Sequence, residues 1–134
     1  MDVIYKLSES HIKDLHNLYS NEWWTNKRSL NQTRNCVEGS QICIGLVHNN
    51  KLIGFVRVIT DFTFKAFIFD LIINKDYRDQ KLGSRLINLV KNHEKLKDIF
   101  HFELYCLPEH KIFYEKFNFA DESGNLKLLR CNNA

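Results

Sequence analysis

The fold is decided by residues 66–88, which read Ala-Phe-Ile-Phe-Asp-Leu-Ile-Ile-Asn-Lys-Asp-Tyr-Arg-Asp-Gln-Lys-Leu-Gly-Ser-Arg-Leu-Ile-Asn. Residues 66–73 form an apolar run rich in aromatic and β-branched side chains, a composition typical of a strand buried on both faces. A polar turn follows over residues 74–80, and apolar residues then recur at the spacing of an amphipathic helix, at Leu82, Leu86, Leu89 and Val90. The stretch therefore predicts a strand, a loop and a helix in succession.

The loop between this strand and helix carries two cations, Arg78 and Lys81, and a glycine, Gly83. The first N–H groups of a helix have no partner within it, and the helix dipole adds partial positive charge at the same end. Backbone N–H groups from Gln80 to Ser84 can therefore converge on an anion such as a phosphate, since glycine lets the chain approach closely. The alternative is a plain strand-to-helix turn whose charges face solvent.

Two segments carry a resemblance to a known family. Arg78-Asp79-Gln80-Lys81-Leu82-Gly83 resembles the acetyl-CoA-binding motif of the GCN5-related N-acetyltransferases (GNATs), in which Arg or Gln is followed by two residues, Gly, one residue, and Gly or Ala. Ile112-Phe113-Tyr114-Glu115-Lys116-Phe117-Asn118-Phe119 is similar to the family's Phe-Tyr-Glu-Lys-x-Gly-Phe segment, with Asn118 in place of Gly. The order of the expected elements also fits, so the resemblance covers nearly the whole chain.

The resemblance implies that acetyl-CoA is the co-substrate and where it binds. Its pantetheine arm would pair with the backbone of a strand that splays from its parallel neighbour, and its pyrophosphate would lie at the loop. The implied contacts are Leu71, Ile72, Ile73, Arg78, Asp79, Gln80, Lys81, Leu82, Gly83 and Ser84. Lys81 departs from the family pattern because it replaces the first motif glycine. We expect an ordinary backbone conformation there, with the lysine side chain pointing outward or folded over a phosphate.

Two residues are candidates for catalysis. Asp70 interrupts the apolar strand, and a buried carboxylate whose pKa is raised can accept the proton of an attacking amine. The alternatives are a structural acid that holds backbone amides or Arg57, and a chain of water molecules without a dedicated base. The resemblance implies that Tyr114 donates a proton to the departing thiolate. Otherwise Tyr114 is a half-buried aromatic residue of the last helix.

The acceptor side is expected to include Trp23 and Trp24, which lie between the first two predicted helices. In relatives this connection lines the acceptor site, although one of the two tryptophans is expected to lie in the core. Asp61, after the preceding strand, is a second candidate for an acidic group near the acceptor. The acceptor could be a small amine, an amino acid, or an amine of a peptide or protein.

Length and composition limit the remaining possibilities. The 134 residues predict a single domain spanning 1–134, which the resemblance implies is an N-acetyltransferase domain. The net charge of +3 does not indicate a nucleic-acid-binding protein. The four cysteines form no CxxC pair, which predicts free thiols and no metal site. With no signal peptide and no apolar run long enough for a membrane span, we expect a cytoplasmic protein. A homodimer is plausible because relatives often pair.

The chain in order predicts strands at residues 3–7, 42–48, 51–60, 66–73, 101–106 and 126–130. Helices are predicted after Ser8 or Ser10, from Thr25 or Asn26 to about Glu38, from Gly83 to about His93 or Lys95, and from Pro108 to about Lys116. The central strands form an antiparallel meander, and a right-handed helical crossover then adds a parallel strand.

The expected class is therefore α/β, with the single-domain acyl-CoA N-acyltransferase fold. Such a fold has a mixed, mostly antiparallel sheet, helices on both faces and a splayed central strand pair. An N-acetyltransferase that moves the acetyl group of acetyl-CoA directly to an amine is the function expected on this fold. The alternative is a non-catalytic acyl-CoA sensor or partner-binding module, which the loss of the motif glycine to Lys81 keeps open.

Overall fold

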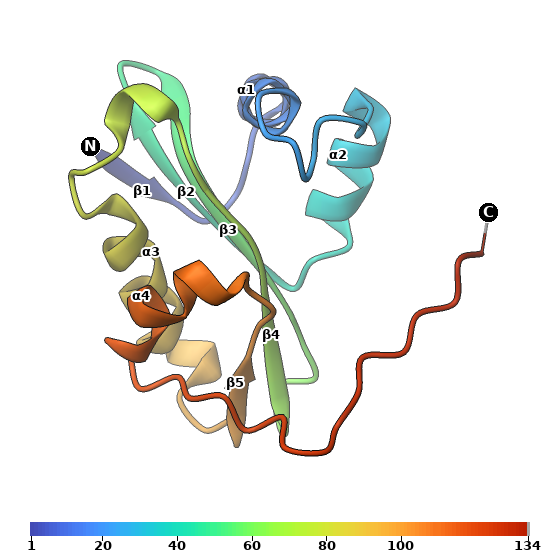
Figure 1. Ribbon diagram of the computed structural model, residues 1–134. Helices are drawn as coiled ribbons and strands as arrows, with labels where there is room; N and C mark the ends of the chain where they lie inside the picture. The colour runs from blue at the N-terminus through green and yellow to red at the C-terminus, as the bar shows by residue number, and fades with distance from the viewer. Residues whose placement is uncertain (134) are drawn as a thin grey trace.

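The computed structural model describes residues 1–133, and its sheet has the strand order β1-β2-β3-β4-β5 (Figure 1). The first four strands pair antiparallel in sequence order, and β4 pairs parallel with β5. The strands are β1 (Asp2–Ile4), β2 (Ile42–His48), β3 (Lys51–Thr60), β4 (Lys65–Ile73) and β5 (His101–Glu103). This arrangement confirms the predicted mixed, mostly antiparallel sheet.

Helices cover both faces of the sheet, as predicted. Figure 1 shows α1 (Glu9–Ser20) and α2 (Leu30–Glu38) on one face, and α3 (Leu82–Lys91) and α4 (Lys111–Glu115) on the other. Short 3₁₀ turns, η1 (Lys75–Tyr77), η2 (Glu94–Leu96) and η3 (Pro108–His110), lie in the connections. Each face has its own apolar core: α1 contributes Ile12, Leu15, Leu18 and Tyr19 to one, and α3 contributes Leu82, Leu86, Ile87 and Val90 to the other.

Serine caps set the starts of α1 and α2. The Ser8 hydroxyl accepts a hydrogen bond from the His11 N–H at 3.2 Å, which fixes the start of α1 where the sequence predicts it. The predicted start of the second helix at Thr25 or Asn26 is wrong, because α2 begins after Ser29, which forms a capping box with Gln32. Residues 21–29 instead form the connection between α1 and α2, and Arg28 of this connection reaches Asp70 of β4.

A β-bulge interrupts the pairing of β3 with β4. Phe55 pairs with Ile72 and Arg57 with Phe69, so one residue of β3 faces two of β4. Asp70, one of these two, has φ 58°, in the left-handed region. The extra residue inverts the alternation of side chains, since Ile68 and Leu71 both pack on the α3 side. Asp70 is thereby turned to the face covered by α1 and α2, where its hydrogen-bond partners lie.

The parallel strands β4 and β5 separate soon after they meet. Their pairing is limited to Lys65–Phe67 opposite His101–Glu103. The strand predicted at residues 101–106 is therefore parallel to its neighbour as expected, but it ends at Glu103. Beyond Phe67, this edge of β4 has no strand partner within residues 1–133. The splayed strand pair that the sequence resemblance implies is present, and the fork opens toward Ile73.

The predicted strand at residues 126–130 is not formed. The segment that follows α4 runs away from the sheet in an extended path (Figure 1), and Leu126, Leu128 and Leu129 are exposed. An alternating apolar pattern stabilises a strand only where a neighbour supplies hydrogen bonds and buries one face, and no described strand lies beside this segment. Across residues 1–133, no helix has the length and apolar character needed to cross a membrane.

Candidate functional site

The start of α3 is a helix N-terminus without a side-chain cap. Lys81 occupies the N-cap position with φ 61° and ψ 24°, and it makes no side-chain capping hydrogen bond. The expectation that lysine would keep an ordinary backbone conformation here is wrong, because Lys81 adopts the left-handed conformation that glycine adopts most readily. The first N–H groups of α3 are thus left to bind an anion, in the geometry that the motif glycine would provide.

Three separate segments meet at Gly83. A Cβ atom at this position would lie 3.4 Å from Phe113 Cζ of α4 and 3.9 Å from Leu71 Cδ2 of β4. The start of α3, the free edge of β4 and the last helix therefore converge at one point. This is the arrangement needed if residues 71–73, the loop 78–84 and the Tyr114 segment are to serve one ligand.

Arg78 does not extend toward the α3 N-terminus in this structure. Its guanidinium forms an ion pair with Glu22, and its Nε donates to the Ile73 carbonyl oxygen at 3.3 Å. These contacts join the α1–α2 connection to the end of β4. Asp79 next to it has φ 64°, so two residues of the loop are left-handed and the chain turns sharply before α3. Gln80 directly precedes the N-cap residue Lys81, and Ser84 is the third residue of α3.

Tyr114 lies in α4 with its ring half-buried among aromatic side chains. Its ring packs edge-on against Phe113 and Phe119, with centroids 5.0 and 5.9 Å apart. Burial, with a smaller contribution from Cys106, raises the pKa of Tyr114 to about 12. The phenol therefore stays protonated at neutral pH and can donate a hydrogen bond or a proton. Asn118, which ends this segment, has φ 69°, as expected of a residue in place of the family's glycine.

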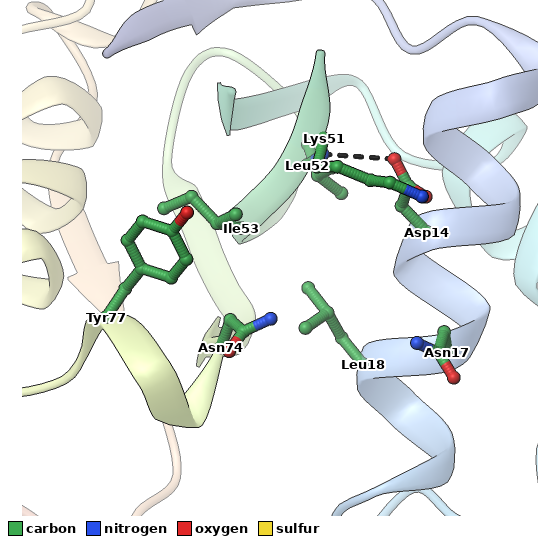
Figure 2. Close-up of a pocket in the computed structure, with 8 residues that line it drawn as sticks. All are labelled: Asp14, Asn17, Leu18, Lys51, Leu52, Ile53, Asn74 and Tyr77. Carbon is green, nitrogen blue, oxygen red and sulfur yellow. Dashed lines mark hydrogen bonds and ion pairs between the residues drawn. The ribbon is translucent and has the colours of Figure 1, made fainter. Parts of the chain in front are cut away.

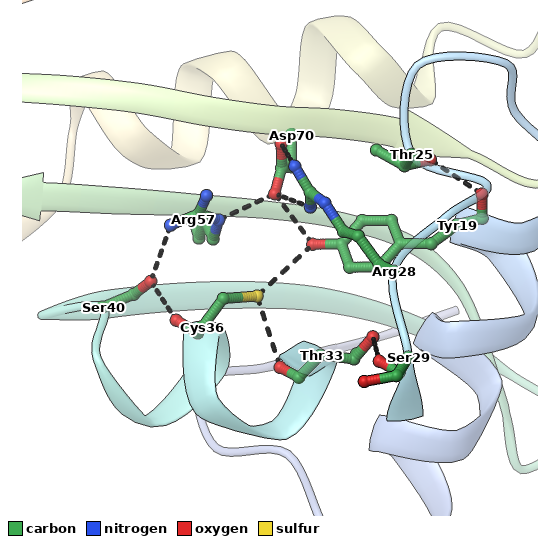
Figure 3. Close-up of polar contacts among 9 residues, drawn as sticks. All are labelled: Tyr19, Thr25, Arg28, Ser29, Thr33, Cys36, Ser40, Arg57 and Asp70. Atoms are coloured by element: carbon green, nitrogen blue, oxygen red, sulfur yellow. Dashed lines mark hydrogen bonds and ion pairs between the residues drawn. The ribbon is translucent and has the colours of Figure 1, made fainter. Parts of the chain in front are cut away.

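Asp70 is the centre of a network of polar side chains (Figure 3). Arg28 approaches with both terminal nitrogens, Nη1 2.6 Å from Oδ2 and Nη2 3.3 Å from Oδ1. Arg57 Nε donates to Oδ2 at 2.7 Å, and the Tyr19 hydroxyl donates to the same oxygen at 2.9 Å. The Asp70 side chain is only 6% exposed. The carboxylate is therefore paired with Arg57, as in the structural alternative that the sequence left open.

The expectation that burial raises the pKa of Asp70 is wrong in its net direction. Burial does favour the protonated acid, but the hydrogen bonds and positive charges of Arg28 and Arg57 outweigh it and hold the pKa below its usual value. Conversely, burial and the Asp70 charge raise the pKa of Tyr19 far above its usual range, so Tyr19 stays neutral. Asp70 in this structure is a fixed anion and a weak proton acceptor.

Sequence reasoning missed Arg28, Tyr19 and Glu22 as members of this region. Tyr19 reads as an ordinary core residue of the first helix and Glu22 as a charge of a connection, whereas Arg28 falls within the predicted second helix. Arg28 is 42 positions from Asp70 along the chain, so no local pattern links them. The signal that was available is the buried acid itself, because a carboxylate inside an apolar strand requires cationic partners.

The predicted acceptor residues are spread over two regions. Trp23 and Trp24 are 71% and 40% exposed, so the expectation that one of them lies in the core is wrong. Both belong to the connection that also carries Glu22 and Arg28. Asp61 lies in the β3–β4 turn, at the end of these strands away from Ile73. Its Oδ1 accepts hydrogen bonds from the N–H groups of Thr63, Phe64 and Lys65. Contact of Asp61 with an acceptor stays a prediction.

Two adjoining pockets lie between α1 and the end of β4. In the first, of about 250 Å³, Asn74 and Tyr77 face Asn17 and Leu18 of α1 (Figure 2). The second, of about 310 Å³, shares Asn17, Leu18 and Asn74 and is also lined by Asn21, Glu22, Ile72, Ile73, Lys75, Asp76 and Arg78. The second pocket therefore contains three of the predicted coenzyme contacts, Ile72, Ile73 and Arg78, together with the carboxylate of Glu22.

Comparison with known proteins places these features in a family. Residues 39–121 match the acetyltransferase (GNAT) domain. The chain is 29% identical over 130 residues to "Uncharacterized N-acetyltransferase ycf52" of Pyropia yezoensis, which covers 92% of this chain and 74% of that protein. Two relatives of the same name, from Gracilaria tenuistipitata var. liui and Porphyra purpurea, are covered over 65% and 67% of their lengths.

Solved structures share the fold at low sequence identity. A protein of Xanthomonas campestris pv. campestris assigned to the GNAT family has a TM-score of 0.83 at 20% identity, over 98% of this chain and 94% of that one. Glucosamine-6-phosphate N-acetyltransferase of Arabidopsis thaliana has a TM-score of 0.69 at 16% identity, over 100% and 99% of the two chains. With the matched domain spanning residues 39–121, this chain belongs to the GNAT acetyltransferase family.

Proposed function

We propose that residues 1–134 act as one N-acetyltransferase domain that moves the acetyl group of acetyl-CoA directly to an amine. The observation that carries this proposal is the convergence at Gly83 of the uncapped α3 N-terminus, the unpaired edge of β4 and the Tyr114 helix. Family membership supports it independently.

The residues around this point fit the chemical groups of acetyl-CoA. A pyrophosphate needs several converging donors, and residues 80–84 present free helix N–H groups with Lys81 and Arg78 nearby. An extended pantetheine arm needs a strand edge, and β4 offers one from Ile68 to Ile73. Leu71 and Ile73 keep their side chains in the α3-side core while their backbone faces the fork. Bound there, the coenzyme supplies an acetyl group activated as a thioester.

Each protein group has a distinct part in this proposal. A backbone N–H of Leu71–Ile73 stabilises the negative charge that develops on the acetyl oxygen, since a fixed donor in a dry site needs no reorganisation. Tyr114, protonated at neutral pH, donates to the sulfur of the departing thiolate. For Arg78 to contact phosphate, it must leave Glu22, which then offers a carboxylate on the side of Trp23 and Trp24.

The route of the amine proton follows from the state of Asp70. Its carboxylate accepts from three side chains and its pKa is held low, so we propose that water molecules remove the proton and that Asp70 positions the strand edge. Direct proton removal by Asp70 stays a prediction. Asp70→Asn tests it: a base would show a lost acidic limb in the pH–rate profile, whereas a positioning residue would lower the rate without changing that limb.

The alternative is a non-catalytic acyl-CoA sensor. The sequence feature that favours a sensor is the loss of the motif glycine to Lys81. The left-handed φ of Lys81 weakens this argument, because the backbone has the conformation that glycine would give. Turnover separates the two functions. Release of free CoA from acetyl-CoA is measured with a panel of primary amines, and amine-dependent release above the rate of spontaneous hydrolysis supports the enzyme. Binding of acetyl-CoA with no release for any amine would support the sensor.

A further inference from the structure

The polar network around Asp70 carries more positive than negative charge. Two guanidinium groups, Arg28 and Arg57, face one carboxylate, and Tyr19 stays neutral, which leaves one positive charge in excess. Arg57 donates through Nε to Asp70 and through Nη1 to Ser40 at 3.4 Å. Its Nη2 has no hydrogen-bond partner within residues 1–133. Arg28 is 30% exposed in its side chain, so part of the cluster faces solvent. The cluster therefore has both the charge and the free donors to bind an anion.

An aromatic strip begins at this cluster. Arg57 Cζ lies 5.0 Å from the centroid of the Phe69 ring, Phe69 stacks on Phe67 with centroids 6.1 Å apart, and Phe67 lies 5.9 Å from Tyr105. Phe67 and Phe69 are half-buried, and Tyr105 is 63% exposed. The strip lies on the α1/α2 face of the sheet, where residues 67 and 69 of β4 stand opposite Ile59 and Arg57 of β3. The strip can therefore bind an apolar or aromatic group, and it lies directly beside the cationic side chain of Arg57.

The position of this surface connects it to the reaction. Asp70 is the residue directly before Leu71, where the proposed acetyl-binding edge begins, and the bulge turns Asp70 and its arginines to the opposite side of the sheet from α3. An acceptor whose anion binds Arg28 and Arg57 would thus have its amine close to the start of that edge. An α-amino acid meets this requirement, because its amine and its carboxylate are attached to the same carbon.

We infer that the acceptor is an α-amino acid with an apolar or aromatic side chain, whose carboxylate binds Arg28 and Arg57 and whose side chain packs on Phe69, Phe67 and Tyr105. This inference rests on the proposed function and names its substrate class. Free amino acids and the N-terminal residue of a peptide differ here, because a peptide lacks the adjacent carboxylate. A compound with a neutral amide in place of the carboxylate should therefore be a poor acceptor.

The first experiment compares L-phenylalanine with L-phenylalaninamide and phenethylamine at saturating acetyl-CoA. We expect a kcat/KM for phenylalanine about tenfold or more above that of the amide, the size of a charge-assisted hydrogen bond. An equal or lower value for the carboxylate overturns the inference while leaving the proposed function intact. Preference for the peptide Phe-Gly-Gly over phenylalanine would also overturn it.

The second experiment does not depend on turnover, so the two proposals can fail separately. Calorimetric titration of the protein, in the presence of CoA, with N-acetyl-L-phenylalanine and N-acetyl-L-phenylalaninamide should give tighter binding of the carboxylate by about tenfold. Binding of neither compound, or of both equally, overturns the inference. If the carboxylate binds selectively but no amine is acetylated, the proposed function fails and the anion site stands.

Variants assign the effect to the named residues. Arg28→Gln should bring the ratio of carboxylate to amide affinity close to one. Arg34→Gln, at a half-buried arginine of α2 that pairs with Glu9, should leave the ratio at the wild-type value. Should Arg28→Gln fail to fold, Tyr105→Ala keeps the test decisive, since this side chain is largely exposed. It should weaken N-acetyl-L-phenylalanine about threefold to tenfold, as expected for one aromatic contact, and leave N-acetylglycine unchanged. An unchanged affinity for both ligands would show that the aromatic strip does not contact the ligand, which would overturn that part of the inference.

Discussion

Arg57 Nε lies 2.7 Å from Asp70 Oδ2, and this contact holds the bulged residue of β4 against its neighbour β3. A second arginine, Arg28, reaches the same carboxylate from the α1–α2 connection. The carboxylate thus fastens a loop to the strand just before the proposed acetyl-binding edge.

Removal of the Asp70 charge should destabilise the protein. Asp70→Asn leaves two partly buried guanidinium groups without a counter-charge, and breaking a buried pair in this way costs about 3–5 kcal/mol in the free energy of unfolding. Urea denaturation monitored by circular dichroism measures the change. Asp98→Asn, an exposed carboxyl, is the matched control and should change the free energy of unfolding by less than about 0.5 kcal/mol. A similar small loss for both variants would contradict the account.

The ion pairs of Asp70 with Arg28 and Arg57 also predict how the free energy of unfolding depends on pH. The folded-state pKa of Asp70 lies below its usual value of 3.8, so the carboxylate contributes its full stability above that pH. The contribution is lost as pH falls below 3.8 through the lower folded-state pKa. Unfolding free energies measured between about pH 2 and pH 7 should therefore show the advantage of wild type over Asp70→Asn shrinking below pH 4. A constant difference over this range would mean that Asp70 has the same pKa in both states.

Loss of the Tyr114 hydroxyl should slow transfer without affecting coenzyme binding. Tyr114→Phe keeps the ring packed on Phe113 and Phe119 but removes the proton donor, so kcat should fall about 100-fold or more. The Kd for acetyl-CoA should stay within a factor of about two, since the phenol acts on the leaving group. Tyr5→Phe, at an exposed tyrosine that packs on His93, should leave both values unchanged. A fall in affinity with normal kcat would assign Tyr114 to binding.

The pKa of Tyr114 also predicts the shape of the rate profile. At a pKa of about 12 the phenol remains almost wholly protonated up to about pH 10. The rate of transfer to an amine should therefore show no loss from Tyr114 ionisation in that range. A basic limb near pH 9 that disappears in Tyr114→Phe would contradict the raised pKa.

The left-handed conformation of Lys81 allows a test of the proposed phosphate-binding loop, residues 78–84. Lys81→Gly relieves a conformation that costs a non-glycine residue roughly 1–2 kcal/mol, partly offset by the larger entropy of glycine in the unfolded chain, so stability should rise by up to about 1 kcal/mol. Because the backbone geometry is retained, the Kd for acetyl-CoA should change by less than about fivefold, the scale of one exposed ionic contact. Lys81→Ala removes the charge but keeps the strain and should not gain stability. A tenfold loss of affinity in both variants would show that the lysine side chain binds phosphate.

The sequence predicted most elements because their signals are local. Strands β2 and β3 have the predicted bounds, and α1 begins directly after the predicted cap Ser8. Asn49 and Asn50, which connect the two strands, both have positive φ. The predicted position of Gly83 at a helix start also agrees with the structure, where Gly83 is the second residue of α3. Hydrophobic periodicity and capping residues carry this information within a few positions of the chain.

The errors concern relationships between distant residues. The charge state of Asp70 depends on Arg28, which approaches through tertiary folding, and desolvation alone predicts the opposite pKa direction. The strand predicted at residues 126–130 has a suitable pattern but no described neighbour, and β5 stops pairing after Glu103 because the two strands diverge. Lys81 takes a glycine-like conformation that a propensity argument disfavours, imposed by the tight turn between η1 and α3.

The most direct test of the account is calorimetric titration of the protein with acetyl-CoA, beside free CoA and ATP. Shared micromolar affinity for acetyl-CoA and CoA with no comparable binding of ATP is the expected result, because the β4 edge recognises the pantetheine arm and the α3 N-terminus recognises the pyrophosphate. Absence of binding to both acetyl-CoA and CoA would contradict the proposed enzyme and the sensor alternative together.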